Sequence, residues 1–557
     1  MSLPKIYAGR RRRWFRLLVA NGAAQAVGGV ALAALLKTAM SEARSGFAPW
    51  PAAGGIALVS VVLLALRFRE ARDAERLGQH FVMRVRLRIF DRLASRPERD
   101  TSAGRWGVTM TRLISDLNSL RNWVSTGVAR AVVAGVSASG LLVGFAWIDP
   151  RASVAAGAMA AICLLAGLAL TPRLRTYIRE SRRRRGRLAN NLGEKVLAVA
   201  SIRELGRVRS ERARIRKHST TLANALVRRM GMAAVLRALP DAVFPLAVAG
   251  VAISAANHGS GAADAVVAVL LLGLVASAFR DLARAWDQRL AFDEGRRRIE
   301  QILAGPMIRE SKNAVELTGE GPLRVEFESV ALDGIFSEVD FRIEPGERVR
   351  LIGASGSGKS SLIALATRSF DPDEGEVLLN DVPLHALSLD SLHGAVQRVS
   401  PDLPLLRGTI AENVGYGAPD IDAGWMAEIV DACGLSDARE ALPDGLDSRV
   451  EERGANLSEG LSARIALARA CAIRPRLLLV DHPIFDTDAT AARALERILE
   501  IAPFTSLIVT TDGSRTPNWG RVMELSEGKL QTHGEFKQPL AGSEPIPRAV
   551  GDSRTSA

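Results

Sequence analysis

Four uncharged apolar stretches constrain this chain more than any other feature of its sequence. They are Leu17–Leu36, Ser45–Leu66, Ala131–Ile148 and Ala152–Pro172. Each is close to the roughly 20 residues that a helix needs to cross the hydrocarbon core of a bilayer. Because backbone polar groups inside a bilayer must find their hydrogen-bond partners within the protein, these stretches predict transmembrane helices.

Two further apolar stretches are interrupted by charged residues, so their boundaries are less sharp. Together the stretches predict six spans, at about 14–37, 45–67, 128–148, 151–172, 232–256 and 264–286. The first span follows a basic cluster, Arg10–Arg13, as a secretory signal would. However, its apolar run is longer than the 7–15 residues of such a signal, and more spans follow it. We therefore interpret it as the first transmembrane helix.

The charges divide the chain into two different parts. In residues 1–311, Lys and Arg exceed Asp and Glu by 28, whereas in residues 312–557 the acidic residues are in excess by 15. The basic clusters alternate with apolar runs, which favours a membrane protein with basic cytosolic loops over a nucleic-acid-binding protein. No metal-type spacing relates the three cysteines, Cys163, Cys433 and Cys471.

The distribution of basic residues also predicts the orientation in the membrane. The loops near 37–49, 149–151 and 257–264 are short and poor in Lys and Arg. By the positive-inside rule we expect a multi-pass protein of the inner or plasma membrane with both termini in the cytoplasm. Two long helical excursions into the cytosol are then expected, at roughly 67–128 and 173–231.

Charged side chains within the fifth span have two possible interpretations. Arg237 and Asp241 are four residues apart beside Pro240. Intramembrane charges often mark a substrate cavity, which makes this pair a candidate. Alternatively, the two side chains pair with each other near the cytosolic mouth. Asn21 and Gln25 on the first span have the same spacing and the same two interpretations.

The most specific motif is a phosphate-binding loop of the form GxxxxGK[ST]. A strand at 347–352 precedes it and a helix follows it, which is the context that the chemistry requires. The glycines allow backbone N–H groups to turn towards a phosphate, and the helix N-terminus adds its dipole. Lys359 is predicted to neutralise phosphate oxygens, and the Ser360 hydroxyl to ligate Mg²⁺. The expected nucleotide-binding residues are Gly353, Ala354, Ser355, Gly356, Ser357, Gly358, Lys359, Ser360 and Ser361.

A second element of the site is an apolar strand that ends in a carboxylate. The sequence RLLLVD runs from Arg476 to Asp481 and is typical of a buried parallel strand. Its position predicts that Asp481 faces a magnesium-bound water. The expected cofactors are therefore ATP and Mg²⁺.

The order of these motifs resembles that of the ATP-binding-cassette (ABC) transporters, and the membrane half is similar to the exporter type. The segment GANLSEGLSARIALARA, at 454–470, resembles the family's signature and the helix after it. The segments 104–121 and 192–203 resemble the two cytosolic loops of the exporters. The resemblance implies an all-α domain of six transmembrane helices at 1–311 and an α/β P-loop NTPase domain at 312–540. The polar tail 541–557 lies outside it and is expected to be disordered.

The resemblance also implies a dimer in the lipid bilayer. Two nucleotide-binding domains would sandwich two ATP molecules, each held by the phosphate loop of one subunit and the signature of the other. The signature residues here are Leu457, Ser458, Glu459 and Gly460. Short coupling helices near 97–104 and 201–211 would dock the cytosolic loops onto these domains.

Several residues depart from the family pattern, and they all fall in the reaction centre. His482 occupies the position of the catalytic glutamate, Pro401 that of a metal-contacting glutamine, and Thr511 that of the switch histidine. Glu459 replaces a glycine of the signature, and Gly334 stands near the position of an aromatic residue that would stack on adenine. His482 is a possible weak base because its pKa is near neutrality, or it is a bystander. Loss of a general base typically lowers the rate about 10²–10⁴-fold.

The sequence thus predicts a half-transporter of the ABC ATPase family that binds ATP but hydrolyses it weakly at its own site. We expect it to export an unidentified substrate as the degenerate subunit of a heterodimer with a second half-transporter. A homodimeric exporter with slow hydrolysis remains an alternative. A nucleotide-sensing membrane protein that transports nothing is a third possibility.

Overall fold

The computed structural model describes residues 3–100, 117–258, 262–438, 442–510 and 520–533. It divides into two compact units, and each is considered by itself. The first unit comprises Met1–Ala94 and Ser102–Gly305, and the second comprises Ser95–Thr101 and Pro306–Ala557.

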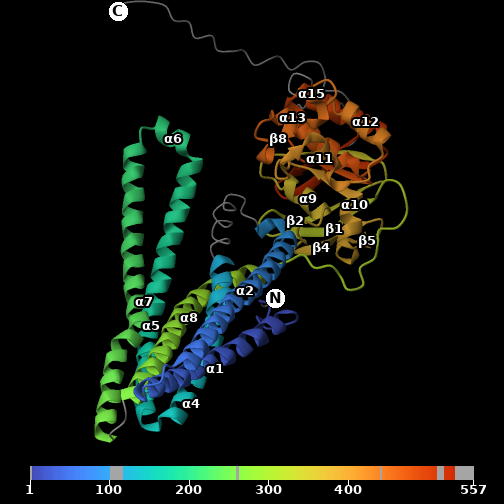
Figure 1. Ribbon diagram of the computed structural model, residues 1–557. Coiled ribbons are helices and arrows are strands. Elements are labelled where there is room, and N and C mark those ends of the chain that lie inside the picture. The colour runs from blue at the N-terminus through green and yellow to red at the C-terminus, as the bar shows by residue number, and fades with distance from the viewer. Residues whose placement is uncertain (1–2, 101–116, 259–261, 439–441, 511–519, 534–557) are drawn as a thin grey trace, which may run out of the picture. The chain divides into compact units, whose positions relative to one another are not determined.

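The first unit is entirely helical in its described part (Figure 1). Six of its helices are long and apolar enough to cross a membrane, which confirms the predicted number of spans. The helices extend well beyond the apolar stretches, as expected from the two long helical excursions that the sequence predicts. Their bounds are α1 Arg11–Arg44, α2 Trp50–Ala94, η3 Trp123–Val128 with α4 Ala129–Ile148, α5 Pro150–Leu197, α6 Val199–Glu204, α7 Val208–His258 and α8 Ala262–Ala304.

Local sequence explains the tight turn between α4 and α5. The Asp149 carboxylate accepts hydrogen bonds from the backbone N–H groups of Arg151 and Ala152, and Pro150 is the first residue of α5. An aspartate cap followed by proline is a strong helix start, because proline lacks only an N–H that would be unpaired there.

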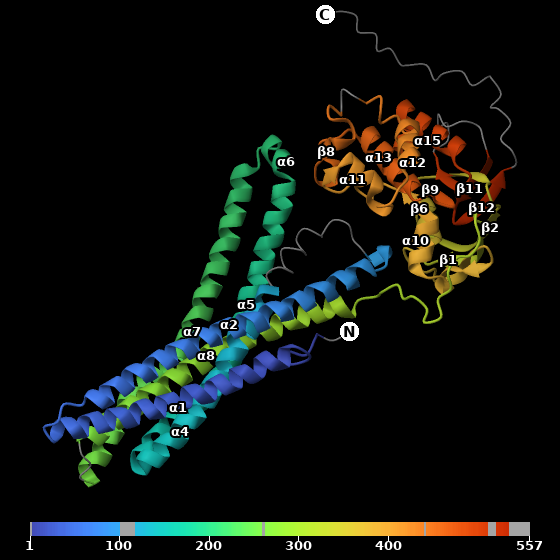
Figure 2. The same cartoon turned by 45° about the vertical axis from the view of Figure 1, so that its right-hand side comes forward.

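The second of the two predicted excursions forms a long hairpin of α5 and α7, with α6 at its tip (Figures 1 and 2). None of the α6 residues is buried. Large apolar side chains are exposed around it, among them Leu197 with 87% of its surface accessible and Leu205 with 74%. This tip falls at the predicted second coupling helix.

Polar side chains join α1 to α2. The Gln25 side-chain amide donates to Asn21 at 2.7 Å and to the Glu70 carboxylate at 2.8 Å. Asn21 in turn donates to the Leu66 carbonyl at 2.8 Å. The i, i+4 pair on the first span thus contributes to packing between helices.

The second unit contains a parallel sheet and an antiparallel sheet. The six-stranded sheet has the order β12-β11-β3-β10-β9-β6, and β12 is its antiparallel edge strand. The four-stranded antiparallel sheet has the order β2-β1-β4-β5, and β7 pairs with β8 in a separate ribbon. The strands are β1 Val325–Leu332, β2 Phe336–Ile343, β3 Arg348–Ile352, β4 Glu374–Leu379, β5 Val382–Pro383, β6 Val396–Val399, β7 Gly408–Thr409, β8 Arg449–Val450, β9 Leu477–Val480, β10 Thr505–Val509, β11 Arg521–Ser526 and β12 Lys529–His533.

Helices and short 3₁₀ turns complete the second unit. In β9 all four residues are buried, as predicted for a parallel strand that is covered on both faces. After β9 and the short helix α14, α15 buries one stripe of apolar side chains and is capped by Asp488. The α-helices are α9 Lys359–Ala366, α10 Leu389–Ala395, α11 Ile410–Val414, α12 Ala423–Ala432, α13 Glu459–Ala472, α14 Ile484–Thr487 and α15 Ala489–Ile501.

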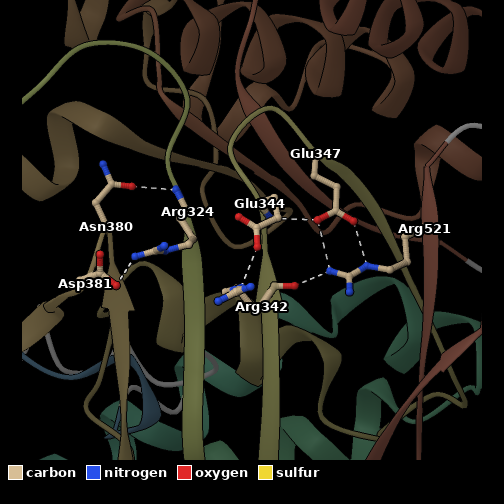
Figure 3. A network of polar contacts seen from close by, with 7 residues as sticks. All are labelled: Arg324, Arg342, Glu344, Glu347, Asn380, Asp381 and Arg521. Carbon is tan, nitrogen blue, oxygen red and sulfur yellow. Dashed lines mark hydrogen bonds and ion pairs between the residues drawn. The ribbon is translucent and has the colours of Figure 1, made fainter.

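A network of polar contacts links the two sheets of this unit (Figure 3). The Arg521 guanidinium on β11 binds the Glu347 carboxylate at 2.9 Å and the Arg342 carbonyl. Nearby, the Arg324 backbone N–H donates to Asn380 at 2.8 Å, and the Arg324 side chain pairs with Asp381. The Arg521 contacts thus join the antiparallel sheet to the six-stranded sheet that carries the phosphate loop, whereas the Arg324 contacts lie within the antiparallel sheet.

A short segment after α2 belongs to the second unit. It includes the 3₁₀ turn η1, Glu98–Asp100. Arg398 on β6 donates to Glu98 at 2.8 Å, and Arg99 binds Asp373 through two contacts of 2.8 and 3.0 Å. The Glu98 backbone N–H also donates to the Ser369 carbonyl. The first predicted coupling helix begins at this segment, and its residues from 101 onward lie outside the described part.

Candidate functional site

The phosphate loop connects the end of β3 to the start of α9. Gly353 has a φ of 145°, and a Cβ there would lie 2.3 Å from the Leu525 carbonyl oxygen. Gly358 has a φ of 107° immediately before the helix. Only glycine fits these positions without strain, so the motif's spacing follows from the path of the backbone.

Two polar side chains of the loop suit an anionic ligand. The Lys359 ammonium donates to the carbonyls of Gly353 and Ala354, at 2.7 and 2.8 Å. Burial lowers the pKa of Lys359, and the Asp481 carboxylate opposes this shift. The Ser357 hydroxyl oxygen is buried and has no hydrogen-bond partner among the described residues. A phosphate in the loop would supply a partner for Ser357 and for the ammonium, so the residues present fit a nucleotide.

The parallel sheet gathers the other predicted residues at the same edge. Asp481 follows β9, Pro401 lies two residues after β6, and the phosphate loop follows β3. In parallel sheets, ligands bind beside the carboxyl ends of the strands. Ser360 is an exposed residue, as magnesium ligation requires. The described residues contain no cluster of three His, Cys, Asp or Glu side chains that could hold a metal. Mg²⁺ commonly uses one or two carboxylates together with substrate phosphates, so a magnesium site at the predicted ligands Asp481 and Ser360 does not require such a cluster.

His482 follows Asp481 and is buried, with 7% of its surface exposed. Its Nδ1 accepts a hydrogen bond from the Ile484 backbone N–H at 3.3 Å, and its ring lies edge-on to Phe485. Burial lowers the pKa of His482, whereas Glu459 and Asp481 act in the opposite direction. A neutral imidazole has one acceptor nitrogen, and here the backbone already occupies it.

The signature segment lies at the start of α13. Ser458 is the N-cap of this helix, and its hydroxyl accepts from the Leu461 N–H at 3.3 Å. Ser458 and Glu459 are exposed, whereas Gly460 is buried. The helix start thus presents N–H groups, and Glu459 adds a negative charge in its first turn.

Beside the phosphate loop is a cavity of about 420 Å³, whose lining includes Gly334, Ile335 and Gly528. A Cβ at Gly358 would lie 2.5 Å from an Ile335 methyl carbon, so Ile335 packs against the loop. Gly334 was singled out from the sequence, because it stands near the position where the family has an aromatic residue that stacks on adenine. Ile335 was not identified from the sequence, because its approach to the loop depends on how β2 pairs with β1.

In the membrane unit, the structure separates the two charged residues of the fifth span. Asp241 on α7 forms an ion pair with Arg280 on α8. Arg237 instead donates to the Ala233 carbonyl of its own helix at 3.0 Å. Thr511, at the predicted switch position, lies outside the described residues, as does the tail from 534 onward.

Comparison with known proteins is consistent with these two units. The family model for the ABC transporter transmembrane region matches residues 14–279, and the model for the ABC transporter matches residues 336–485. An ATP-dependent lipid A-core flippase of Chromobacterium violaceum is 26% identical over 87% of this chain and 85% of its own length. One from Bordetella avium is 27% identical over 84% and 81%.

Similarity to a solved structure extends over nearly the whole chain. A bacterial Atm1-family ABC exporter with ATP bound has a TM-score of 0.79, with coverage of 93% of this chain and 94% of the other. The two sequences are 22% identical.

Proposed function

The chain belongs to the ABC transporter family, as a half-transporter of the exporter type, and on that premise we propose that its own nucleotide site binds ATP but hydrolyses it poorly. We further propose that it works as the degenerate subunit of a heterodimer, with Mg²⁺ held by Ser360 and Asp481 and with both termini in the cytoplasm. The relatives that are named lipid A-core flippases support a molecule taken from the bilayer as the transported substrate.

The contact between the imidazole of His482 and the Ile484 N–H carries the proposal of poor hydrolysis. A general base must offer a lone pair to the attacking water. In the neutral ring, Nδ1 accepts from the backbone, so Nε2 carries the hydrogen and can only donate. The lowered pKa favours this neutral form. The ring therefore occupies the glutamate's position without supplying its chemistry.

The retained groups account for nucleotide binding. Lys359 supplies positive charge, Asp481 and Ser360 can hold Mg²⁺, and the loop N–H groups and the N-terminus of α9 stabilise phosphate. When MgATP is bound, the metal would neutralise phosphate charge. A competent partner would then supply the second hydrolytic site, and the exposed Ser458 and Glu459 would face its nucleotide.

Turnover by the purified chain in nanodiscs tests this proposal. We expect MgATP binding with ATP turnover about 10²–10⁴-fold below that of a competent member of the family. His482→Glu should raise turnover but leave it about 10²-fold below that of a competent member, because Pro401 and Thr511 remain. His385→Glu is the matched control, since His385 is exposed in the same unit.

Brisk hydrolysis by the unmodified chain would refute the proposal of a degenerate site. Co-purification of two differently tagged copies tests the assembly. Efficient capture of one copy by the other would favour the homodimeric alternative over the heterodimer.

A further inference from the structure

The membrane unit contains a partly open apolar cavity of about 450 Å³. It lies among α5, α7, α8 and the π-helical segment η3, and its lining includes Cys163, Leu168, Leu236 and Phe279. Small-molecule sites commonly measure about 300–1,000 Å³ and combine apolar walls with a few polar groups. The size and lining of this cavity therefore suit an apolar molecule or the apolar part of a larger one.

Among the described residues, Arg289 is the one charged residue in this lining. Its guanidinium carbon lies 5.4 Å from the ring centres of both Trp123 and Phe292, which hold it by cation–π contacts. One nitrogen is 3.4 Å from the Asp293 carboxylate. The side chain is 37% exposed and carries five N–H donors, so this single ion pair leaves it able to bind a second acidic group.

The aromatic walls of the cavity are held in place by hydrogen bonds outside it. The Trp286 indole N–H donates to the Thr171 hydroxyl at 2.8 Å, which satisfies the ring's polar atom. In η3, the Thr126 hydroxyl contacts Gln288 on α8 at 3.0 Å. π-helical turns such as η3 occur frequently at functional sites. The cavity is thus preorganised, with rings on its walls and one cation at its edge.

We propose that this cavity binds an amphipathic molecule with a single acidic head group. The apolar part occupies the space between α5, α7 and α8, and the head binds Arg289. Charge complementarity at Arg289 selects an acid over an amine or a neutral amphiphile. This inference rests on the proposed function and adds to it the chemical class of the ligand and the residue that selects it.

Photolabelling with an acidic probe tests the inference. The full-length protein is placed in phosphatidylcholine nanodiscs with palmitic acid that carries a diazirine in its chain. Labelled peptides are mapped by mass spectrometry, with and without excess unlabelled palmitate. We expect labelling of the lining segments of α5, α7 and α8 that palmitate displaces, and no displaceable labelling by the hexadecylamine with the same diazirine.

Two pairs of variants assign the binding to the cavity. Arg289→Gln should lower the displaceable labelling about tenfold, the usual size of a charge-assisted hydrogen bond. Arg284→Gln is the control, because Arg284 is on the same helix but pairs with Asp281 outside the lining. Gly167→Leu places a side chain in the cavity and should abolish displaceable labelling. Gly157→Leu on the same helix is its control, since Gly157 faces open space.

Equal displaceable labelling by the acid and the amine would overturn the inference, as would equal effects of the two arginine variants. MgATP binding is measured in parallel on every variant. Elution of Gly167→Leu in detergent as a single symmetric peak, at the volume of the unmodified protein, reports whether its membrane unit has folded. If the unmodified protein showed normal nucleotide binding but no displaceable palmitate labelling, the ligand class alone would be refuted. Absence of nucleotide binding by the unmodified protein would refute the proposed function instead.

Discussion

Replacing Ser357 with alanine should affect the free protein and the nucleotide-bound protein in opposite ways. The Ser357 hydroxyl oxygen is buried without a hydrogen-bond partner among the described residues, and it lies near Gly353 within the phosphate loop. An unsatisfied buried polar group costs about 1–3 kcal/mol. Ser357→Ala removes that group, so we expect the thermal midpoint without nucleotide to stay constant or rise.

Nucleotide binding should become weaker in the same variant. A hydrogen bond to a charged group contributes about 1.5–3 kcal/mol, which corresponds to a decrease in MgATP affinity of roughly ten- to a hundredfold. At a fixed saturating concentration, a tenfold weaker affinity removes about 1.4 kcal/mol of the stabilisation that the ligand provides. The gain in thermal midpoint on adding MgATP should therefore shrink.

Two measurements on full-length protein in detergent check this pair of effects. Affinity is measured by titration with a fluorescent ATP analogue and Mg²⁺, and stability by the intrinsic fluorescence of the protein during heating. Ser436→Ala is the control, because Ser436 is exposed in the same unit. If Ser357→Ala lowered the midpoint without nucleotide and changed the affinity less than twofold, the hydroxyl would have a structural role and this reasoning would be wrong.

Three further predictions concern other parts of the second unit. Burial depresses the pKa of His482, so the stability contributed by its neutral imidazole is complete above the ordinary histidine pKa and is lost as pH falls through the depressed pKa. Between pH 7 and pH 5, the thermal midpoint of His482→Gln should therefore fall less than that of the unmodified protein. Glu98→Ala removes the partner of Arg398, whose side chain is only 10% exposed, so the thermal midpoint should fall and the free energy of unfolding should decrease by about 1–3 kcal/mol. A double-mutant cycle with Arg398→Ala should show that the effects of the two substitutions are coupled. Burial raises the pKa of Cys471 to about 12 and that of Cys433 well above its ordinary value. Peptide mass spectrometry should therefore show that N-ethylmaleimide at pH 7.5 labels neither thiol in the native protein and both thiols in denaturant.

Local sequence was sufficient to predict the six membrane helices and the phosphate loop. An apolar run such as Leu17–Leu36 can satisfy its backbone in lipid only as a helix, whatever its neighbours are. The glycines of the phosphate loop likewise follow from the local path of the backbone, since Gly353 and Gly358 both have positive φ. The position of Asp481 at the end of a buried strand was predictable, because a strand as apolar as Leu477–Val480 is typical of the centre of a parallel sheet.

What the tertiary structure decided were the partners of polar side chains between elements distant in sequence. Asp241 binds Arg280 on the next helix, and Glu98 binds Arg398, which is 300 positions away. The orphaned hydroxyl of Ser357 also became evident only from its burial. Spacing along one helix or strand reports which residues share a face, but these contacts depend on how separate elements pack. For the same reason, the proposed role of Arg289 in ligand binding could be inferred only from the cavity that α5, α7 and α8 form beside it.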